Sequence, residues 1–290
     1  MAQTTRGSVL RAVMWMSGAV VSFIAMAIAG RAVSLDLDTF EIMTWRSIVG
    51  IVIVLAVLTF RHRWGDVRTA HLGMHLGRNL CHFTGQNLWF FAITVIPLAQ
   101  VFALEFTAPL WVLVLSPFVL GERLTRMRAL AGLIGFVGIL IVARPGASPL
   151  SPGLIAAAVA AIGFAGTAVL TRRLTRSETI YAILFWLTAM QAVFGLVCAG
   201  YDGDITLPSA STAPWLILIG CAGLLAHFCL TTALSLAPAT LVMPIDFARL
   251  PLAVVLGALA YGEGVDPFVV LGAVVIFGGN YLNIWSETRA

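Results

Sequence analysis

Residues 97–122 read PLAQVFALEFTAPLWVLVLSPFVLGE, and residues 238–263 read PATLVMPIDFARLPLAVVLGALAYGE. A shift of 141 residues superimposes the second stretch on the first without a gap. The shift aligns two prolines, two acidic residues that precede phenylalanine and two Gly-Glu pairs: Pro97 with Pro238, Glu105 with Asp246, Phe106 with Phe247, and Gly121-Glu122 with Gly262-Glu263. It also aligns Gly138 with Gly279. The chain therefore contains an internal repeat of about half its length.

The composition is typical of a membrane protein. Of the 290 residues, 60% are apolar and only 10% are charged, and the mean hydropathy is +0.99. A helix that crosses the roughly 30 Å hydrocarbon core needs about 20 mostly apolar residues, so ten crossings occupy nearly the whole chain. Pro97 and Pro238 each divide a run long enough for two crossings. We predict ten transmembrane helices, at residues 9–30, 39–60, 73–96, 98–119, 128–143, 153–171, 179–200, 213–236, 239–260 and 267–285.

The arginines predict the orientation of these helices, because cytoplasmic loops carry the excess of positive charge. All 17 basic residues are arginines. With a cytoplasmic N-terminus, twelve of these 17 fall on the cytoplasmic side: Arg6, Arg11, Arg61, Arg63, Arg68, Arg123, Arg126, Arg128, Arg172, Arg173, Arg176 and Arg289. Arg31 and Arg144 alone face outward, where the loops collect carboxylates. We predict a bacterial inner-membrane protein with both termini in the cytoplasm.

The two predicted halves, residues 1–147 and 148–290, hold five helices each. Because five is odd, the second half enters the membrane in the opposite orientation. The loops agree, since residues 121–128 include three arginines and residues 262–266 include none. We therefore predict an all-α polytopic membrane protein of ten transmembrane helices in two inverted five-helix repeats. Such halves can exchange conformations around a midplane site, which favours a transporter.

The whole chain resembles the EamA-type members of the drug/metabolite transporter superfamily, and among them most the YddG-type amino-acid exporters. The resemblance rests on the two repeats and on a Gly-Glu-x-Leu-Thr motif at residues 121–125, followed by a glycine-rich helix with Gly132, Gly135 and Gly138. The second repeat departs from the motif at Gly264 and Asp266. The resemblance implies export of amino acids or related metabolites through a central cavity lined by most helices except the fifth and tenth.

Few ionisable groups lie inside the predicted helices, and each is a candidate for the site. A charged group at the bilayer centre costs about 2.5 to 3.5 kcal/mol on insertion scales, so it requires a partner, a cavity or a function. The candidates for substrate binding or the pathway are Arg46, Arg78, Asn79, His82, Gln86, Trp89, Glu105, Trp186, His227, Asp246 and Arg249. Asn87 and Gln191 add neutral polar groups.

Several of these candidates can pair with one another. Glu105 and Arg46 lie at similar predicted depths, so they can form an ion pair that either binds substrate or only joins two helices. Asp246 and Arg249, three residues apart, can pair on one helix face, again with either role. Arg78 can reach Asp246 or extend to the inner membrane surface.

Four candidates form a stripe on the third predicted helix. Arg78, His82, Gln86 and Trp89 recur every three or four residues on an otherwise apolar helix. Since a lipid-facing polar stripe is costly, we expect it to face the protein interior. His227 aligns with Gln86 under the shift of 141 residues, and a buried neutral histidine is as good an interpretation as a substrate ligand. Aromatic residues such as Trp186 can line a substrate site or simply pack.

The sequence argues against several other classes of protein. It contains no Walker A loop, nucleophile elbow or zinc-protease helix, and the single His-x-x-x-His spacing at His71 and His75 is too little for a diiron oxygenase. The four cysteines lack the spacing of a metal site. We therefore predict no enzyme, no cofactor, no metal and no nucleic-acid partner. The glycines of the fifth helix and Gly272, Gly278 and Gly279 of the tenth indicate close helix packing.

The sequence thus predicts a transporter in the lipid bilayer that exports amino acids, including aromatic or other apolar ones, and related small metabolites by alternating access. A multidrug exporter of lipophilic cations with the same fold is the alternative, and a membrane enzyme or channel is less favoured. Coupling to protons stays open, because a buried carboxylate can equally be a fixed partner of arginine.

Overall fold

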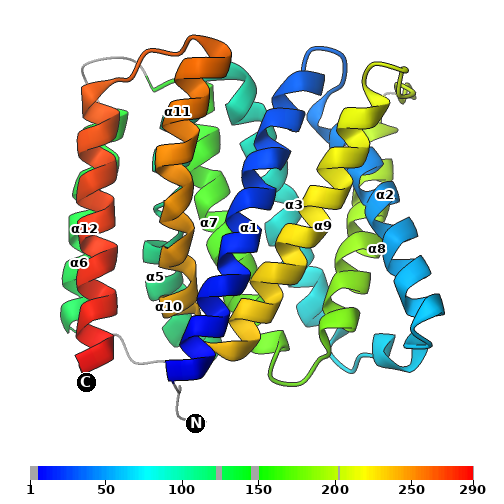
Figure 1. Cartoon of the computed structure of the whole chain (residues 1–290), viewed down its shortest axis with the longest axis horizontal. Coiled ribbons are helices and arrows are strands. Elements are labelled where there is room, and N and C mark those ends of the chain that lie inside the picture. The colour runs from blue at the N-terminus through cyan, green and yellow to red at the C-terminus, as the bar shows by residue number, and fades with distance from the viewer. Residues whose placement is uncertain (1–5, 122–125, 145–149, 202, 290) are drawn as a thin grey trace. The chain divides into compact units, whose positions relative to one another are not determined.

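The computed structural model describes residues 6–121, 126–144, 150–201 and 203–289, and these residues form helices joined by turns and loops, without a β-strand (Figure 1). The helices, including two short 3₁₀ segments, are α1 (Arg6–Val33), α2 (Thr39–Phe60), η1 (Trp64–Val67), α3 (Leu72–Val95), α4 (Leu98–Glu105), α5 (Ala108–Leu120), α6 (Arg126–Ala143), α7 (Pro152–Leu174), α8 (Ile180–Ala199), α9 (Ala213–Leu236), α10 (Ala239–Val242), η2 (Met243–Ala248), α11 (Arg249–Tyr261) and α12 (Pro267–Arg289). The predicted all-α class is confirmed for this part of the chain.

Length and hydropathy identify a multi-pass membrane protein. Among the described residues, six helical segments are long and apolar enough to cross a membrane: 10–33, 39–60, 98–120, 152–174, 180–199 and 213–236. Three shorter apolar helical segments lie at 129–142, 252–261 and 267–279. The number of ten crossings therefore stays a prediction.

The chain divides into two compact units. Unit 1 comprises residues 1–83 and 170–236, and unit 2 comprises residues 84–169 and 237–290. Each unit therefore takes helices from both predicted halves of the sequence, and α3 and α7 are shared between the units. The predicted halves are defined by position along the chain, whereas the units are defined by contacts in space. The boundaries of the halves therefore stay a prediction.

The bounds of several helices correspond under the shift of 141 residues. Shifted in this way, α3 (Leu72–Val95) takes the bounds of α9 (Ala213–Leu236), and α5 (Ala108–Leu120) takes those of α11 (Arg249–Tyr261). Both α5 and α11 are followed by a glycine in the left-handed region, Gly121 with φ of 71° and Gly262 with φ of 64°. A side chain at either position would be strained, so glycine ends both helices.

The predicted helices at 98–119 and 239–260 each contain a local interruption, although residues 98–120 together form one membrane-length apolar segment. The first breaks between α4 and α5, where Pro109 has no N–H to donate to the carbonyl of Glu105 and its ring crowds that carbonyl. The second contains η2, whose 3₁₀ turns lie between α10 and α11. Pro244 and Pro251 remove N–H donors from this segment. The two interruptions occupy corresponding positions of the repeat.

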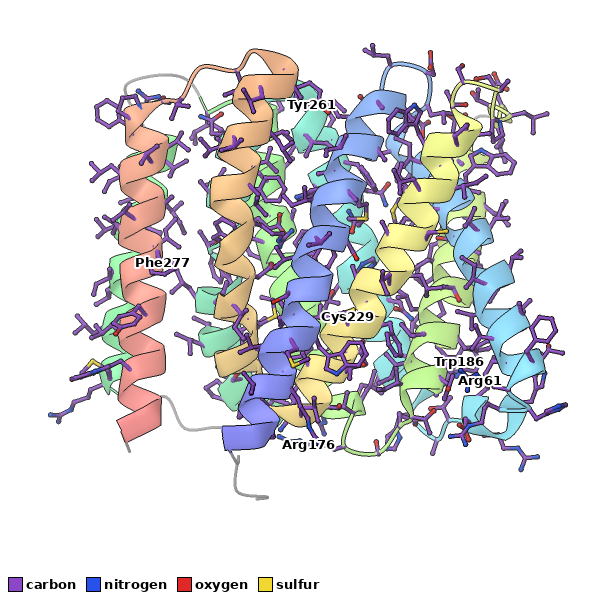
Figure 2. The ribbon with its side chains drawn as sticks, viewed as in Figure 1. Arg61, Arg176, Trp186, Cys229, Tyr261 and Phe277 are labelled. Atoms are coloured by element: carbon purple, nitrogen blue, oxygen red, sulfur yellow. The ribbon has the colours of Figure 1, made fainter. Side chains whose placement is uncertain are left out.

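In unit 1, α1 packs on α9 and α2 packs on α8 and α9. Small residues permit these close contacts, since a Cβ atom at Gly195 of α8 would lie 3.0 Å from Cα of Thr44 on α2. A Cβ atom at Gly220 of α9 would lie 2.5 Å from Cγ1 of Val49. Figure 2 shows Arg61, after α2, and Arg176, after α7, at the same end of this unit.

In unit 2, α6 packs along α12 (Figure 1). A Cβ atom at Gly138 would lie 2.5 Å from Cγ1 of Ile276, and one at Gly279 would lie 2.9 Å from the carbonyl oxygen of Ala131. The prediction of close packing is confirmed for Gly138 and Gly279 but not for Gly278, which meets nothing within 4 Å. The partner of the last helix is its counterpart in the repeat. Gly132 has no such neighbour within 4 Å, so this glycine is not required for the contact.

Candidate functional site

Unit 1 contains a buried group of basic and amide side chains from four helices. We call it the cationic cluster; its members are Arg46 of α2, Arg78, Asn79 and His82 of α3, Gln191 of α8 and His227 of α9. None of the six is more than 6% exposed. Burial of so many polar groups within apolar helices is expensive unless they are hydrogen-bonded or bind a ligand.

Hydrogen bonds to neutral groups hold Arg78 in place. Its Nε donates to Oγ1 of Thr171 at 3.1 Å, and its Nη1 donates to Oδ1 of Asn79 at 2.7 Å. Asn79 in turn donates from Nδ2 to the carbonyl oxygen of Trp186 at 3.0 Å. The Nε2 of Gln191 donates to the carbonyl oxygen of Asn79 at 2.9 Å. These bonds fix α3 against α8 and orient the guanidinium of Arg78.

Arg46 has weaker partners. Its Nη1 lies 3.3 Å from Sδ of Met43, which is a poor acceptor. The guanidinium lies against α9, where a Cβ atom at Gly223 would be 2.7 Å from its Nε. Gly223 thus makes room for the charged group. None of the acidic residues that the structure describes forms an ion pair with Arg46 or with Arg78, and the positive charges of the two arginines act on each other.

The two histidines of the cluster contact each other directly. The Nε2 atoms of His82 and His227 are 2.8 Å apart, with ring centroids 4.5 Å apart and an interplanar angle of 72°. One Nε2 must donate and the other accept, so a single proton lies between them. Both Nδ1 atoms lack a hydrogen-bond partner among the described residues. The pair joins α3 to α9 and keeps two polar atoms available in a buried place.

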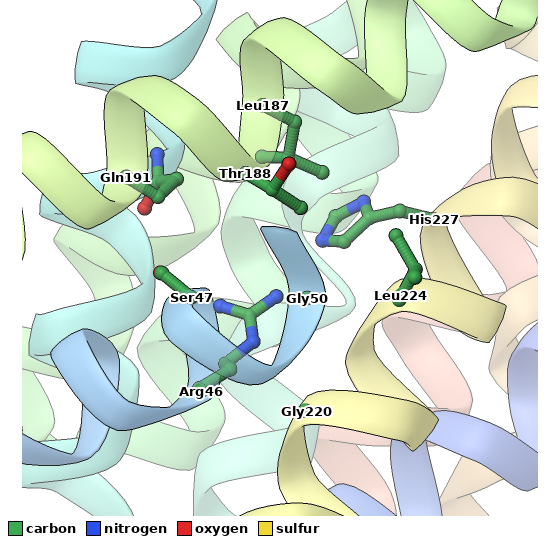
Figure 3. A pocket seen from close by; sticks show the side chains of 9 residues that line it. All are labelled: Arg46, Ser47, Gly50, Leu187, Thr188, Gln191, Gly220, Leu224 and His227. Atoms are coloured by element: carbon green, nitrogen blue, oxygen red, sulfur yellow. The ribbon is translucent and has the colours of Figure 1, made fainter. Parts of the chain in front are cut away.

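A small cavity adjoins the cluster (Figure 3). Arg46 projects from α2, Thr188 and Gln191 from α8, and His227 from α9, and all of them line it. Its volume is about 20 Å³, which accommodates about one water molecule. In this conformation the cavity is therefore too small for a metabolite.

An apolar groove lies beside this cavity on the same three helices. It has a volume of about 490 Å³, and its lining includes Val54 and Val57 of α2, Leu184 of α8, and Leu224 and Phe228 of α9. Leu224 lines both the groove and the cavity. Polar and apolar surfaces thus adjoin each other on α2, α8 and α9, and share Leu224.

Unit 2 contains a second buried polar group, which we call the carboxylate cluster: Trp89 of α3, Glu105 of α4, Asp246 of η2 and Arg249 of α11. Arg249 donates from Nη2 to Oε1 of Glu105 at 2.7 Å and from Nε to Oδ1 of Asp246 at 2.7 Å. Trp89 donates from Nε1 to Oε2 of Glu105 at 2.8 Å. The guanidinium also lies 5.4 Å from the centroid of the Phe102 ring. Two carboxylates thus surround one cation at the two helix interruptions.

A third polar group lies outside the membrane-spanning helices. Oε1 of Glu178 accepts from Oγ1 of Thr69 at 2.6 Å and lies 3.0 Å from Nδ1 of His71. Burial raises the pKa of Glu178, but the hydrogen bonds from Thr69 and His71 and the nearby imidazoles together outweigh burial, so the pKa lies below the ordinary value. This contact joins the segment before α3 to the turn before α8.

The profile of the family described as "EamA-like transporter family" matches residues 10–144 and again residues 151–285. The chain belongs to the EamA-like transporter family. The two matches begin 141 residues apart, which equals the shift of the internal repeat. This finding confirms the family resemblance and assigns to the chain a two-repeat membrane fold and a general role in transport.

Curated relatives of this EamA-like transporter carry names with substrates. It is 31% identical over 240 residues to a riboflavin transporter of Brucella anthropi, with 81% of this chain and 84% of the relative covered. It is 25% identical to an S-adenosylmethionine uptake transporter of Rickettsia felis, with 95% and 93% covered. A riboflavin transporter of Vibrio cholerae is 29% identical, with 97% and 95% covered. A crystal structure superimposes with a TM-score of 0.71 at 18% identity, covering 96% of this chain and 97% of the other, which shows a shared fold.

The structure brings most of the predicted candidates of this transporter into one of the two clusters. The stripe of α3 is buried as predicted, with Arg78, His82 and Trp89 each 1% exposed and Gln86 2% exposed. Trp186 contributes its carbonyl oxygen, whereas its indole Nε1 donates to the carbonyl oxygen of Val67, away from the cluster. Gln86 belongs to unit 2, and its Nε2 has no hydrogen-bond partner among the described residues.

The predicted pairings have different outcomes. The pair of Asp246 and Arg249 is confirmed. Glu105 binds Arg249 of its own unit, and its predicted pair with Arg46, a residue of unit 1, stays a prediction. Arg78 binds the neutral groups of Thr171 and Asn79 within unit 1. Gln191, which the sequence suggested only as a neutral neighbour, lines the cavity; an amide within a long apolar run is the signal that could have identified it.

Proposed function

We propose that this transporter moves a small metabolite with an apolar or aromatic body and a polar head rich in hydrogen-bond acceptors, and that the cationic cluster binds the head. The observation that carries the proposal is the buried cluster itself, in which Arg46, Gln191 and His227 line one cavity. Arginine, amide and imidazole donors suit carbonyl and carboxylate oxygens. The adjoining apolar groove suits the body of such a molecule.

The names of the relatives support this class of substrate. Riboflavin and S-adenosylmethionine both combine a heteroaromatic ring system with polar groups, and relatives at 25% to 31% identity are named for them. The sequence predicted export of amino acids, and the curated relatives named here do not support that narrower function. S-adenosylmethionine contains an amino-acid group, so amino acids belong in the test. The Rickettsia felis relative is named for uptake, so the test must follow both directions.

The cationic cluster argues against the alternative of a lipophilic-cation exporter. Two buried arginines without an acidic partner repel a substrate that carries only positive charge and offers no anionic group to the same site. A cation would need the carboxylate cluster, where Arg249 already binds both carboxylates.

The helix interruptions support transport by alternating access. In transporters built from inverted repeats, alternating access is largely a movement of one half against the other, and discontinuous helices recur at corresponding positions of the two halves. Here α4 stops at Glu105 before α5, and η2 occupies the corresponding place before α11. We therefore include in the proposal ten crossings, inverted halves at 1–147 and 148–290, cytoplasmic termini and an inner-membrane location.

Transport by purified protein in liposomes tests the proposal. Radiolabelled riboflavin, S-adenosylmethionine, tryptophan and alanine are offered from either side, with and without a pH gradient. We expect saturable movement of at least one of them. The Gln191→Leu variant should reduce that transport about tenfold, because a net hydrogen bond of about 1.4 kcal/mol is lost at the site. Val197→Ala, an exposed site on the same helix, is the matched control.

The proposal fails if inserted, folded protein moves none of the four compounds. It also fails in its choice of site if Gln191→Leu transports as well as Val197→Ala. A rate that depends on the pH gradient would add proton coupling.

A further inference from the structure

We infer that the cationic cluster recognises a negatively charged group of its ligand, a carboxylate or similar oxyanion, through Arg46 and Arg78. The inference rests on the proposed function insofar as the ligand is the transported substrate. The charge recognition itself can be measured by binding, without transport.

The first argument compares the buried arginines of the two units. Arg249 of unit 2 is 3% exposed and binds two carboxylates. Arg46 and Arg78 of unit 1 are 6% and 1% exposed, and no described acidic side chain pairs with either. A buried charge without a partner is destabilising, and such residues in membrane helices mark ligand or ion pathways by default. A ligand anion would supply the missing charge.

The second argument concerns the donors that the two guanidinium groups retain. A guanidinium carries five N–H donors and has no acceptor. Arg46 uses one of them, toward a sulfur atom. Arg78 uses two, toward neutral oxygens of Thr171 and Asn79 that fix its orientation. The remaining donors fit the two oxygens of a carboxylate, which guanidinium binds in a bidentate manner.

The third argument concerns space. The cavity beside Arg46 holds one oxygen-sized group, and Gln191 and His227 line it with further polar atoms. The Nδ1 atom of His227 and the Oε1 atom of Gln191 have no hydrogen-bond partner among the described residues. Leu224 lines both this cavity and the apolar groove. A molecule with a carboxylate head and an aromatic body matches this pairing of a polar cavity with an apolar groove.

Thermal unfolding of the purified full-length protein in detergent tests this inference with benzoate and benzamide. The two probes share a ring and a planar head and differ in charge. At equal ionic strength, benzoate at about tenfold excess over its dissociation constant should raise the melting temperature by roughly 3–6 °C, and benzamide should not. Arg46→Gln and Arg78→Gln should each abolish the rise. Arg176→Gln, an exposed arginine of the same unit outside the cavity, should keep it.

Three results would overturn the inference: no rise with benzoate in the wild-type protein, an equal rise with benzamide, or an unchanged rise in both glutamine variants. If a glutamine variant does not fold, the lysine variant at that position retains the charge without the bidentate geometry, and the benzoate effect should still fall. Binding of benzoate in a protein that transports none of the four panel compounds would leave the anion site intact and reject only the proposed substrates.

Discussion

Replacement of Arg249 by glutamine should destabilise the protein more than replacement of Glu105, although the two side chains share a hydrogen bond. Without Arg249, both Glu105 and Asp246 lose their cation while they remain buried, at 8% exposure each. Removal of one partner from a buried ion pair costs about 3–5 kcal/mol. Two orphaned carboxylates place the expected loss for Arg249→Gln in the upper part of that range.

Glu105→Gln is milder, because the remaining groups still satisfy most of the cluster. Glu105 accepts from Trp89 on one oxygen and from Arg249 on the other. Glutamine retains one oxygen, so one charge-assisted bond of about 1.5–3 kcal/mol is lost. Arg249 keeps Asp246 as its counter-ion. At about 2–4 °C per kcal/mol, Arg249→Gln should melt roughly 5 °C below Glu105→Gln.

Circular dichroism of the purified variants during heating measures this order. Exposed Arg126, also in unit 2, supplies the control Arg126→Gln, which should stay within about 0.5 kcal/mol of the wild-type protein. The double variant of Glu105 and Arg249 should lose less than the sum of the single losses, because the two residues interact. Two results would contradict this reasoning: equal stability of Arg249→Gln and Glu105→Gln, or a stability loss in the double variant equal to the sum of the two single losses. Either result would mean that the charges of this cluster do not stabilise one another.

Three further predictions follow from single contacts. Gly223→Ala should displace the Arg46 guanidinium, whose Nε would lie 2.7 Å from the new Cβ, and reduce benzoate binding with a stability loss of about 1–3 kcal/mol; unchanged binding would contradict the placement of Arg46. Gly138→Val should overpack the contact of α6 with α12 and lower the melting temperature by several degrees, whereas Gly132→Ala, which meets nothing within 4 Å, should not. Glu178→Gln should weaken the dependence of the unfolding free energy on pH in acid. Because the pKa of Glu178 is lowered in the folded protein, its ionised form contributes stability above about pH 4.3, and this stability is lost as the pH falls through the folded-state pKa. Unfolding free energies of the wild-type protein and the variant that change in parallel between about pH 5 and 3 would refute the role of Thr69 and His71.

Much of the helix layout follows from hydropathy and proline. The predicted ranges 39–60 and 213–236 coincide with α2 and α9, since apolar runs bounded by turns define them. Hydropathy does not detect the interruptions after Glu105 and at η2, because the side chains on both sides remain apolar. The sequence signal is the missing backbone N–H of Pro109 and of Pro251. It is found only by asking, for each N–H and C=O group along the run, which hydrogen-bond partner is available.

The polar stripe of α3 was predictable from spacing, whereas the ion pairs were only partly so. Counting residues along a helix estimates depth, and Glu105 and Arg46 have similar depths. Depth does not say in which direction around the helix axis a side chain points. The side chain of Glu105 points toward Arg249, which is therefore its partner. The pair of Asp246 and Arg249 was predictable because both residues lie three positions apart on one segment.

The balance of charge within each unit distinguishes a structural cluster from a binding cluster. In unit 2, both carboxylates of the carboxylate cluster bond to Arg249, so each buried charge there has a counter-ion within the protein. In unit 1, Arg46 and Arg78 are bonded to sulfur and to neutral oxygens, and two histidine nitrogens and an amide oxygen lack partners among the described residues. Folding alone gains nothing from such an arrangement, because apolar side chains of similar volume would cost less to bury. The cluster is stabilised when an anion enters it, and a transporter can use that gain to favour one conformation over another.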